Sequence, residues 1–440
     1  MSTAALAVVH LAVAALAAVP ASAAPAAAPG TAPLTAPTTA PTAAAAAGAL
    51  TAPAGFVGMA PKRILDTRDG YQVPVDRTAR PLQAGRYFST PIATGCHSHP
   101  PQECYGVVPA DATAVVVNVT VTDPTADSYV TLSATPGASG TKPATSSVNF
   151  RPGQTVSNLV TVATGPIERF VPWLTLYNNA GTAHVVLDVV GYYRTAATDR
   201  YAPVAPTRIA DSRSDGTGRL GGDAVRSYQV TSPELGTADA TAVVLNVTTT
   251  DGSWDSFVTA YPTGTTRPAN GSNVNFPAGS TVANRVVVPV GADGRIDLYN
   301  HAGWVHVIID VVGYYGPSGT GLFSALKTPV RAFDSRTGFG DGVPAWATGQ
   351  IQAVPADGSV PNAVGVETNV TATDVHADGH LTVFPGPGKA PNTSTVNVAP
   401  GRTTANSATT AVTSGGTYSV YNHGYWLHLI ADVNGYYVTG

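Results

Sequence analysis

The segment from Cys96 to Cys104 is the most compact group of reactive side chains in the sequence, because it also contains His97 and His99. Two cysteines and two histidines can form a tetrahedral zinc site. Zinc ligand pairs usually come from two turns that direct four side chains inward, and adjacent Cys96 and His97 fit that geometry poorly. The alternative is a disulfide between the two cysteines, which are eight positions apart.

Aromatic residues form a second group. Trp304 and Trp426 each follow a Gly-bearing turn, whereas the corresponding turn earlier in the chain has Thr182. A tryptophan in the core would be expected in every copy of the repeat. A tryptophan that one copy lacks is therefore better explained as peripheral, and a peripheral indole can stack on a sugar ring. The alternative is packing, either between neighbouring repeats or as a lid over one repeat. We predict the ligand-binding residues Trp304, Trp426, Trp254, Asn300 and Asn422.

A third group consists of recurring ionisable residues. The string Asp-[Ser/Thr]-Arg ends at Arg68, Arg213 and Arg336, and a later string, Asp-Val-x-Gly-Tyr-Tyr, begins at Asp188, Asp310 and Asp432. An aspartate among apolar strand residues must be paired or hydrogen-bonded. We therefore predict structural ion pairs and not catalytic sites. For Asp310 the expected partner is Arg213, with a Thr hydroxyl or a backbone amide as the alternative.

Pairs of aspartates form an Asp-x-x-x-Asp pattern that occurs three times, at Asp123/Asp127, Asp251/Asp255 and Asp374/Asp378. Two carboxylates in a tight loop could bind calcium, which requires six to eight oxygen ligands. The alternative is a hairpin turn in which an aspartate caps its own backbone. The sequence contains no nucleophile elbow, P-loop or His-Glu-x-x-His motif. We predict no catalytic residues, no metal and no cofactor.

These residues belong to three copies of one repeat. The copies span residues 56–193, 201–315 and 323–437, and seven residues join each pair. Apolar residues alternate with a period of two, as in the segment from Ala242 to Thr250, and Gly, Pro and Asn punctuate the runs. We therefore predict an all-β fold with three tandem antiparallel β-sandwich or barrel-like modules, the first of which contains the Cys loop.

The N-terminal region differs in composition, since residues 1–61 contain no Asp, Glu, Lys or Arg. An apolar stretch followed by Ala21-Ser22-Ala23 predicts a signal peptide over residues 1–23. The Ala/Pro/Thr-rich residues 24–55 predict a disordered, extended linker. Export to the cell exterior favours the Cys96–Cys104 disulfide over the zinc site.

Charged residues make up 11% of the chain and the formal net charge is −4. A nucleic-acid partner is therefore not expected, because such proteins carry a basic patch. The apolar N-terminal stretch is shorter than the roughly 20 residues that a membrane-spanning helix needs. We expect no membrane span in the mature chain.

The strings Pro-x-Arg-x-x-Asp-[Ser/Thr]-Arg, Leu-Asn-Val-Thr and Asp-Val-Val-Gly-Tyr-Tyr, which are all present in residues 201–315, resemble a tandem repeat module of secreted actinobacterial proteins. The resemblance covers residues 56–440. It implies secretion and occurrence in tandem, sometimes beside cell-wall-active enzymes. Copy three departs from the pattern at Asn434, where the other copies have Val190 and Val312.

The expected function is that of an exported, non-catalytic protein that binds an extracellular surface, such as cell-wall or environmental glycan. One alternative is a structural spacer or assembly subunit with pseudo-threefold packing of its modules. A second alternative is an unrecognised secreted hydrolase.

Overall fold

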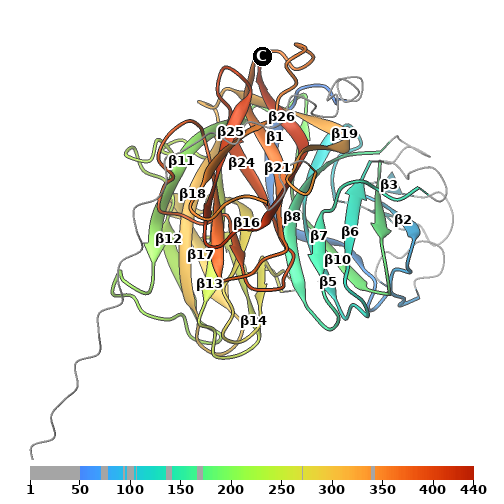
Figure 1. Cartoon of the computed structure of the whole chain (residues 1–440), viewed down its shortest axis with the longest axis vertical. Coiled ribbons are helices and arrows are strands. Elements are labelled where there is room, and N and C mark those ends of the chain that lie inside the picture. The colour runs from blue at the N-terminus through green and yellow to red at the C-terminus, as the bar shows by residue number, and fades with distance from the viewer. Residues whose placement is uncertain are drawn as a thin grey trace, which may run out of the picture. The chain divides into compact units, whose positions relative to one another are not determined.

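The computed structural model describes residues 50–70, 78–92, 95–96, 104–105, 107–134, 141–165, 172–269, 271–337 and 342–440. The predicted signal peptide and most of the predicted linker lie outside these residues. Within them the chain forms antiparallel strands and one short 3₁₀ turn (Figure 1). The prediction of an all-β, antiparallel sandwich fold is confirmed. No helix in this part of the chain is long and apolar enough to cross a membrane.

We call residues 55–194, 200–316 and 321–439 modules 1, 2 and 3. Module 1 contains β1 (Gly55–Asp66), β2 (Arg86–Pro91), β3 (Gly95–Cys96), β4 (Cys104–Tyr105), β5 (Ala114–Thr122), β6 (Ser128–Ser133), β7 (Val148–Phe150), β8 (Val156–Ala163), β9 (Trp173–Asn178) and β10 (His184–Arg194). Module 2 contains β11 (Arg200–Asp211), β12 (Val225–Gln229), β13 (Ala242–Thr250), β14 (Ser256–Pro262), β15 (Val274–Phe276), β16 (Val282–Pro289), the 3₁₀ turn Ala292–Gly294, β17 (Arg295–Asn300) and β18 (His306–Gly316). Module 3 contains β19 (Gly321–Asp334), β20 (Thr348–Gln352), β21 (Ala363–Thr373), β22 (Gly379–Phe384), β23 (Val396–Val398), β24 (Thr404–Ala411), β25 (Thr417–His423) and β26 (His428–Thr439).

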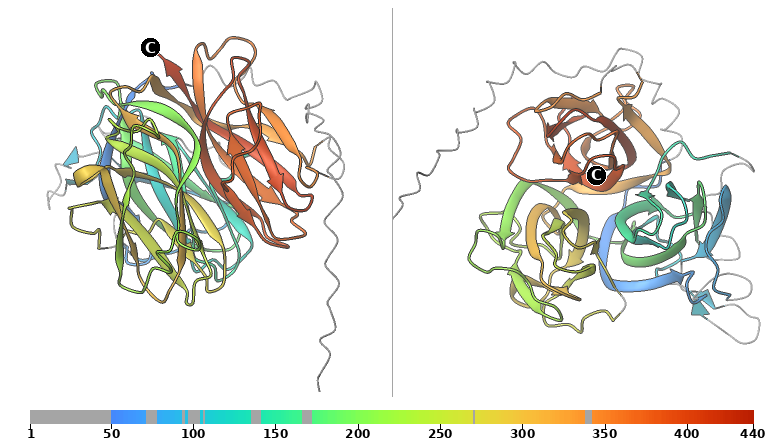
Figure 2. Two further views of the ribbon diagram at one scale, coloured as in Figure 1. Left: turned by 90° about the vertical axis from the view of Figure 1, so that its left-hand side faces the viewer. Right: turned by 60° about the horizontal axis from the view of Figure 1, so that its bottom comes forward.

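Each module is a sandwich of two four-stranded sheets. The inner sheets have the orders β1-β10-β5-β8, β11-β18-β13-β16 and β19-β26-β21-β24, and the last two join through β11 and β19. The outer sheets have the orders β2-β9-β6-β7, β12-β17-β14-β15 and β20-β25-β22-β23. Figure 2 (right) shows the three sandwiches arranged around a common centre, with their inner sheets facing it.

Both faces of the inner sheets are buried, and β13 shows why. Val243, Leu245 and Val247 contribute to the core of module 2 itself. Val244 and Asn246 on the opposite face are also buried, because this face meets the neighbouring modules. The sequence of β13 is therefore apolar on one face and mixed on the other, as expected for a strand covered on both sides.

Buried asparagines join the modules in a closed ring. Asn118 donates to the Ser272 carbonyl at 2.6 Å, and Asn246 donates to the Ser394 carbonyl at 2.5 Å. Asn369 closes the ring by donating to the Ser146 carbonyl at 2.7 Å. A second set of buried asparagines bonds to the first: Asn284 to Asn118, Asn406 to Asn246 and Asn158 to Asn369. Leaving any of these amides unpaired would be costly, so the ring specifies how the modules dock.

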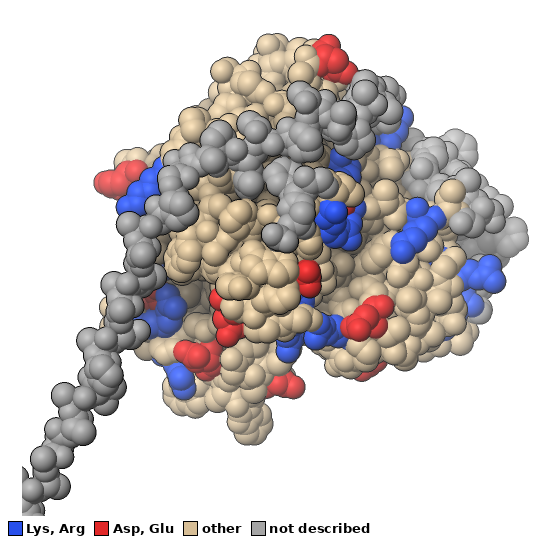
Figure 3. Space-filling view, viewed as in Figure 1, with Lys and Arg blue, Asp and Glu red and all other residues tan. Residues whose placement is uncertain are grey.

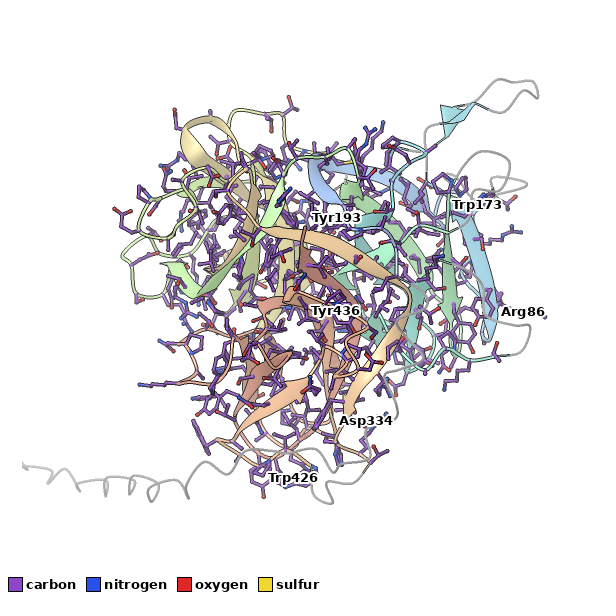
Figure 4. All side chains as sticks on the ribbon, turned by 90° about the horizontal axis from the view of Figure 1, so that it is seen from above. Arg86, Trp173, Tyr193, Asp334, Trp426 and Tyr436 are labelled. Atoms are coloured by element: carbon purple, nitrogen blue, oxygen red, sulfur yellow. The ribbon has the colours of Figure 1, made fainter. Side chains whose placement is uncertain are left out.

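An aromatic cluster lies between the same three modules. The hydroxyls of Tyr193, Tyr315 and Tyr437 are hydrogen-bonded to one another at 2.6–3.1 Å. Three further rings pack against these tyrosines, namely Phe56, Tyr201 and Phe323. All six side chains are essentially inaccessible to solvent. Figure 4 accordingly shows Tyr193 toward the middle of the three ribbons and Trp426 at the outer end of module 3.

The end of the predicted linker is ordered, which corrects that prediction for residues 50–55. The Thr51 amide donates to the Ala325 carbonyl at 2.9 Å, and the Ala54 amide donates to the Phe323 carbonyl at 3.0 Å. Ala54 is buried, and β1 already begins at Gly55. The physical reason is that β19 offers unpaired backbone groups at this edge. Residues 50–54 bond to the first strand of module 3. The first strands of modules 1 and 2 bond at the equivalent position to residues of the seven-residue joints.

The Cys loop is described only as a backbone pairing. Cys96 in β3 and Cys104 in β4 are directly opposite each other in an antiparallel register. Their side chains and residues 97–103 lie outside the described part, so the disulfide stays a prediction. We expect mass spectrometry of the non-reduced mature protein to find both cysteines blocked to alkylation, because an oxidising exterior contains no reductant. Alkylation of both without prior reduction would contradict the bond.

Candidate functional site

The closing aspartates are buried and paired, but with a different arginine from the one expected. Asp310 accepts from Arg208 Nε at 2.8 Å and from Arg208 Nη2 at 3.3 Å. The prediction that Arg213 is its partner is wrong, because Arg213 bonds to Asp211 at 2.7–2.8 Å. Arg208 lies directly opposite Asp310 in the register of β11 and β18, whereas Arg213 lies in the turn beyond β11.

The same geometry recurs in the other modules. Asp188 pairs with Arg63 and Asp432 with Arg331, while Arg68 and Arg336 bond to Asp66 and Asp334. Burial raises the pKa of Asp310 above its ordinary value, against the opposing effect of Arg208. The guanidinium of Arg213 lowers the pKa of Asp211. Each module therefore contains a small ionic cluster of two arginines and two aspartates.

A hydroxyl–imidazole contact also recurs beside these clusters. Ser212 Oγ lies 3.0 Å from His306 Nδ1, and the same oxygen accepts from the Val307 amide at 2.9 Å. The equivalent pairs are Ser335 with His428 and Thr67 with His184. Ser212 is buried and its oxygen is held by the Val307 amide. This hydroxyl–imidazole contact resembles part of a catalytic triad, but it links the first strand of each module to the last strand of the same module.

Two predicted ligand-binding residues do not face a ligand. Asn300 and Asn422 are completely buried. The Asn300 amide donates to carbonyls in the turn that follows it, including that of Gly303 at 3.0 Å. Asn422 does the same with the carbonyl of Tyr425 at 2.8 Å. These asparagines shape the Trp-bearing turns, and their assignment as contact residues was wrong.

Trp254 and Trp304 are brought together at the outer end of module 2. They expose 67% and 59% of their surfaces. Ser253 fixes the two turns to each other, because its amide donates to the Trp304 carbonyl at 2.9 Å and its hydroxyl accepts from the Trp304 amide at 2.8 Å. Gly303 lies against Ser253 and Trp254, so a side chain at that position would collide with the Ser253 hydroxyl.

A surface hollow of about 590 Å³ adjoins Trp304. It is lined by Trp304, Gly221 and two arginines, Arg219 and Arg226, together with neighbouring residues of the segment before β12. Arg226 donates to the carbonyls of that segment and is held in place. Arg219 is exposed. Neither arginine was predicted, because neither belongs to a motif that recurs in the three copies.

Trp426 differs from Trp304 although the two turns correspond. It is half-buried, with its ring 4.1 Å from that of His376. The exposed indole of module 3 is instead Trp346, which is 50% exposed, has a φ of 59° and contacts His423 by its edge. None of the three predicted tryptophans lies between modules.

The first aspartate of each Asp-x-x-x-Asp loop has the backbone geometry of a turn residue. Asp123, Asp251 and Asp374 all have φ between 51° and 54°, a left-handed conformation that aspartate tolerates in turns. Within the described residues, no three His, Cys, Asp or Glu side chains come close enough to hold a metal ion. On the face shown in Figure 3, acidic and basic side chains are interspersed over a mostly uncharged surface.

Comparisons with known proteins identify no family for this chain. No family model and no curated protein matches this sequence. Two solved structures, described as the triple jelly roll fold and turret assembly in an archaeal virus and as the atomic structure of Sulfolobus Turreted Icosahedral Virus, align with 88% of this chain and 91% of their own. Both are 10% identical, with TM-scores of 0.15 and 0.14, too low to support any inference about this chain.

Proposed function

We propose that this chain is an exported, non-catalytic protein that binds glycan on an extracellular surface through the outer end of module 2. The observation that carries this proposal is the pair of exposed indoles, Trp254 and Trp304, on turns fixed to each other beside a hollow. Large exposed aromatic residues beside polar groups are typical of binding surfaces. The flat indole face suits the apolar face of a sugar ring.

The supporting residues also fit a saccharide. Arg219 and Arg226 supply guanidinium donors around the hollow, and Gly221 places backbone close to Trp304. A shallow hollow with several donors and one aromatic wall provides both stacking and hydrogen bonds to hydroxyls. The tryptophans are not needed to join the modules, since the aromatic and asparagine contacts between modules do not include them.

The test replaces each of the two tryptophans by the residue that another module has at the corresponding position. Module 1 has Thr182 where module 2 has Trp304, and module 3 has Ala377 where module 2 has Trp254. We expect the variant Trp304→Thr/Trp254→Ala to lose most binding in pull-downs on insoluble polysaccharides and purified cell walls. Its free energy of unfolding should stay within about 1 kcal/mol of wild type, as for surface substitutions.

Trp346→Asp serves as the matched control, because it removes an indole of similar exposure and introduces the residue found at the corresponding Asp223. Binding should be unchanged in this control. Wild-type binding by the double variant would contradict the proposal.

A second candidate function is that of a rigid spacer or assembly subunit. The observation that favours it is the closed ring of buried asparagines and tyrosines, which joins the three modules into one body. A spacer needs no exposed indoles. No binding by the wild type to any of the polysaccharides or cell walls would favour this second candidate.

A further inference from the structure

A second hollow lies between modules 1 and 3. Its volume is about 500 Å³, and its wall includes Tyr129, Lys142 and Asn149 from module 1 and Arg331, Arg336 and Thr371 from module 3. The two modules are fixed against each other here, because Arg331 donates to the Ala144 carbonyl at 2.7 Å and Asn369 to the Ser146 carbonyl. The hollow is therefore a preformed feature of the docked modules.

The hollow carries excess positive charge. Arg331 is neutralised by Asp432 and Asp334, and Arg336 shares Asp334. Lys142 has no carboxylate partner among the described residues, and its ammonium lies 5.4 Å from the centre of the Tyr129 ring. Three cations thus face two carboxylates, so one positive charge remains to pair with an anionic group of a ligand.

A buried hydroxyl points to a missing partner in the same place. Thr371 lines the hollow, is 2% exposed, and its Oγ1 has no hydrogen-bond partner. A buried polar group without a partner is costly and calls for an explanation, such as a ligand. Asn149 and the hydroxyl-bearing Thr373 and Thr403 line the same wall.

We propose that this hollow between modules 1 and 3 binds a short saccharide that carries a carboxylate, such as a uronate unit. Lys142 and the free edge of Arg336 receive the carboxylate, Thr371 and Asn149 bond to sugar hydroxyls, and Tyr129 forms the aromatic wall. The number of hydroxyl and amide groups around a single excess charge suits an acidic sugar better than an acidic peptide. The choice of a saccharide rests on the proposed function, but the residues are separate from Trp254 and Trp304.

Isothermal titration of the mature protein with digalacturonate and with its neutral counterpart, galactobiose, tests this proposal. Digalacturonate should bind at least tenfold more tightly than galactobiose, because only its carboxylates can pair with Lys142. Lys142→Ala should weaken digalacturonate binding at least tenfold. Thr371→Val should weaken it several-fold without lowering the melting temperature, since the lost hydroxyl has no protein partner.

Lys389→Ala, which removes another exposed lysine, is the matched control and should bind like wild type. The variant Trp304→Thr/Trp254→Ala should also keep digalacturonate binding, so failure at the end of module 2 is distinguishable from failure here. Equal affinity for the two disaccharides, or wild-type affinity in Lys142→Ala, would overturn the proposal. If Trp304→Thr/Trp254→Ala weakened digalacturonate binding and Lys142→Ala did not, the acidic sugar would bind at module 2. This result would also overturn the proposal.

Discussion

Replacing Arg285 by Leu should destabilise the protein by about 3–5 kcal/mol, the usual cost of breaking a buried ion pair by removing one partner. Arg285 and Glu367 are almost completely buried where the modules meet, and Arg285 Nη2 lies 2.7 Å from Glu367 Oε1. Arg285 also donates to Thr161 of module 1 and Thr409 of module 3. Burial acts to lower the pKa of Arg285, but the Glu367 carboxylate raises it above its ordinary value.

The chain offers its own control for this experiment. Leu159 of module 1 occupies the position that corresponds to Arg285, and Val244 of module 2 occupies the position that corresponds to Glu367. The double variant Arg285→Leu/Glu367→Val should regain most of the lost stability, because an apolar pair of suitable size often replaces a buried ion pair without net cost. Urea unfolding of the three proteins measures the effect. A single variant as stable as wild type would show that this pair does not hold the modules together.

Removing the closing aspartate of module 2 should also have a large effect. We expect Asp310→Ala to lower the free energy of unfolding by about 3 kcal/mol, because it leaves the partly buried Arg208 guanidinium without its main partner. Asp310 is 0% exposed and lies on a central strand of the inner sheet. The measurement is chemical or thermal unfolding at neutral pH.

Two arginine variants serve as controls for the partner assignment. Arg208→Ala should destabilise the protein to a similar extent, since it leaves Asp310 buried and unpaired. Arg213→Ala should cost at most about 1 kcal/mol, because the Arg213 side chain is 46% exposed and Asp211 keeps Arg208 as a partner. A larger loss in Arg213→Ala than in Arg208→Ala would contradict the pairing described above.

Local sequence patterns predict the strands and the residues that are buried in them. Alternation over Ala242–Thr250 and the Gly, Pro and Asn turns predicted antiparallel strands, because side chains alternate between the two faces of a strand. The same alternation marked Asp310 as a buried polar group. These features depend on local spacing, which a single sequence contains in full.

Which side chains contact one another depends on strand register and on the docking of the sheets. Arg208 opposes Asp310 because the register of β11 and β18 shifts on both sides of Arg208, and such bulges are not visible in the sequence. Asn246 bonds to a carbonyl of module 3, a contact that depends on how two sheets dock. Trp304 is exposed while Trp426 is half-buried, because module 3 places His376 beside its turn. Partners far apart in the chain are set by register and docking, and neither is encoded in the local pattern of residues.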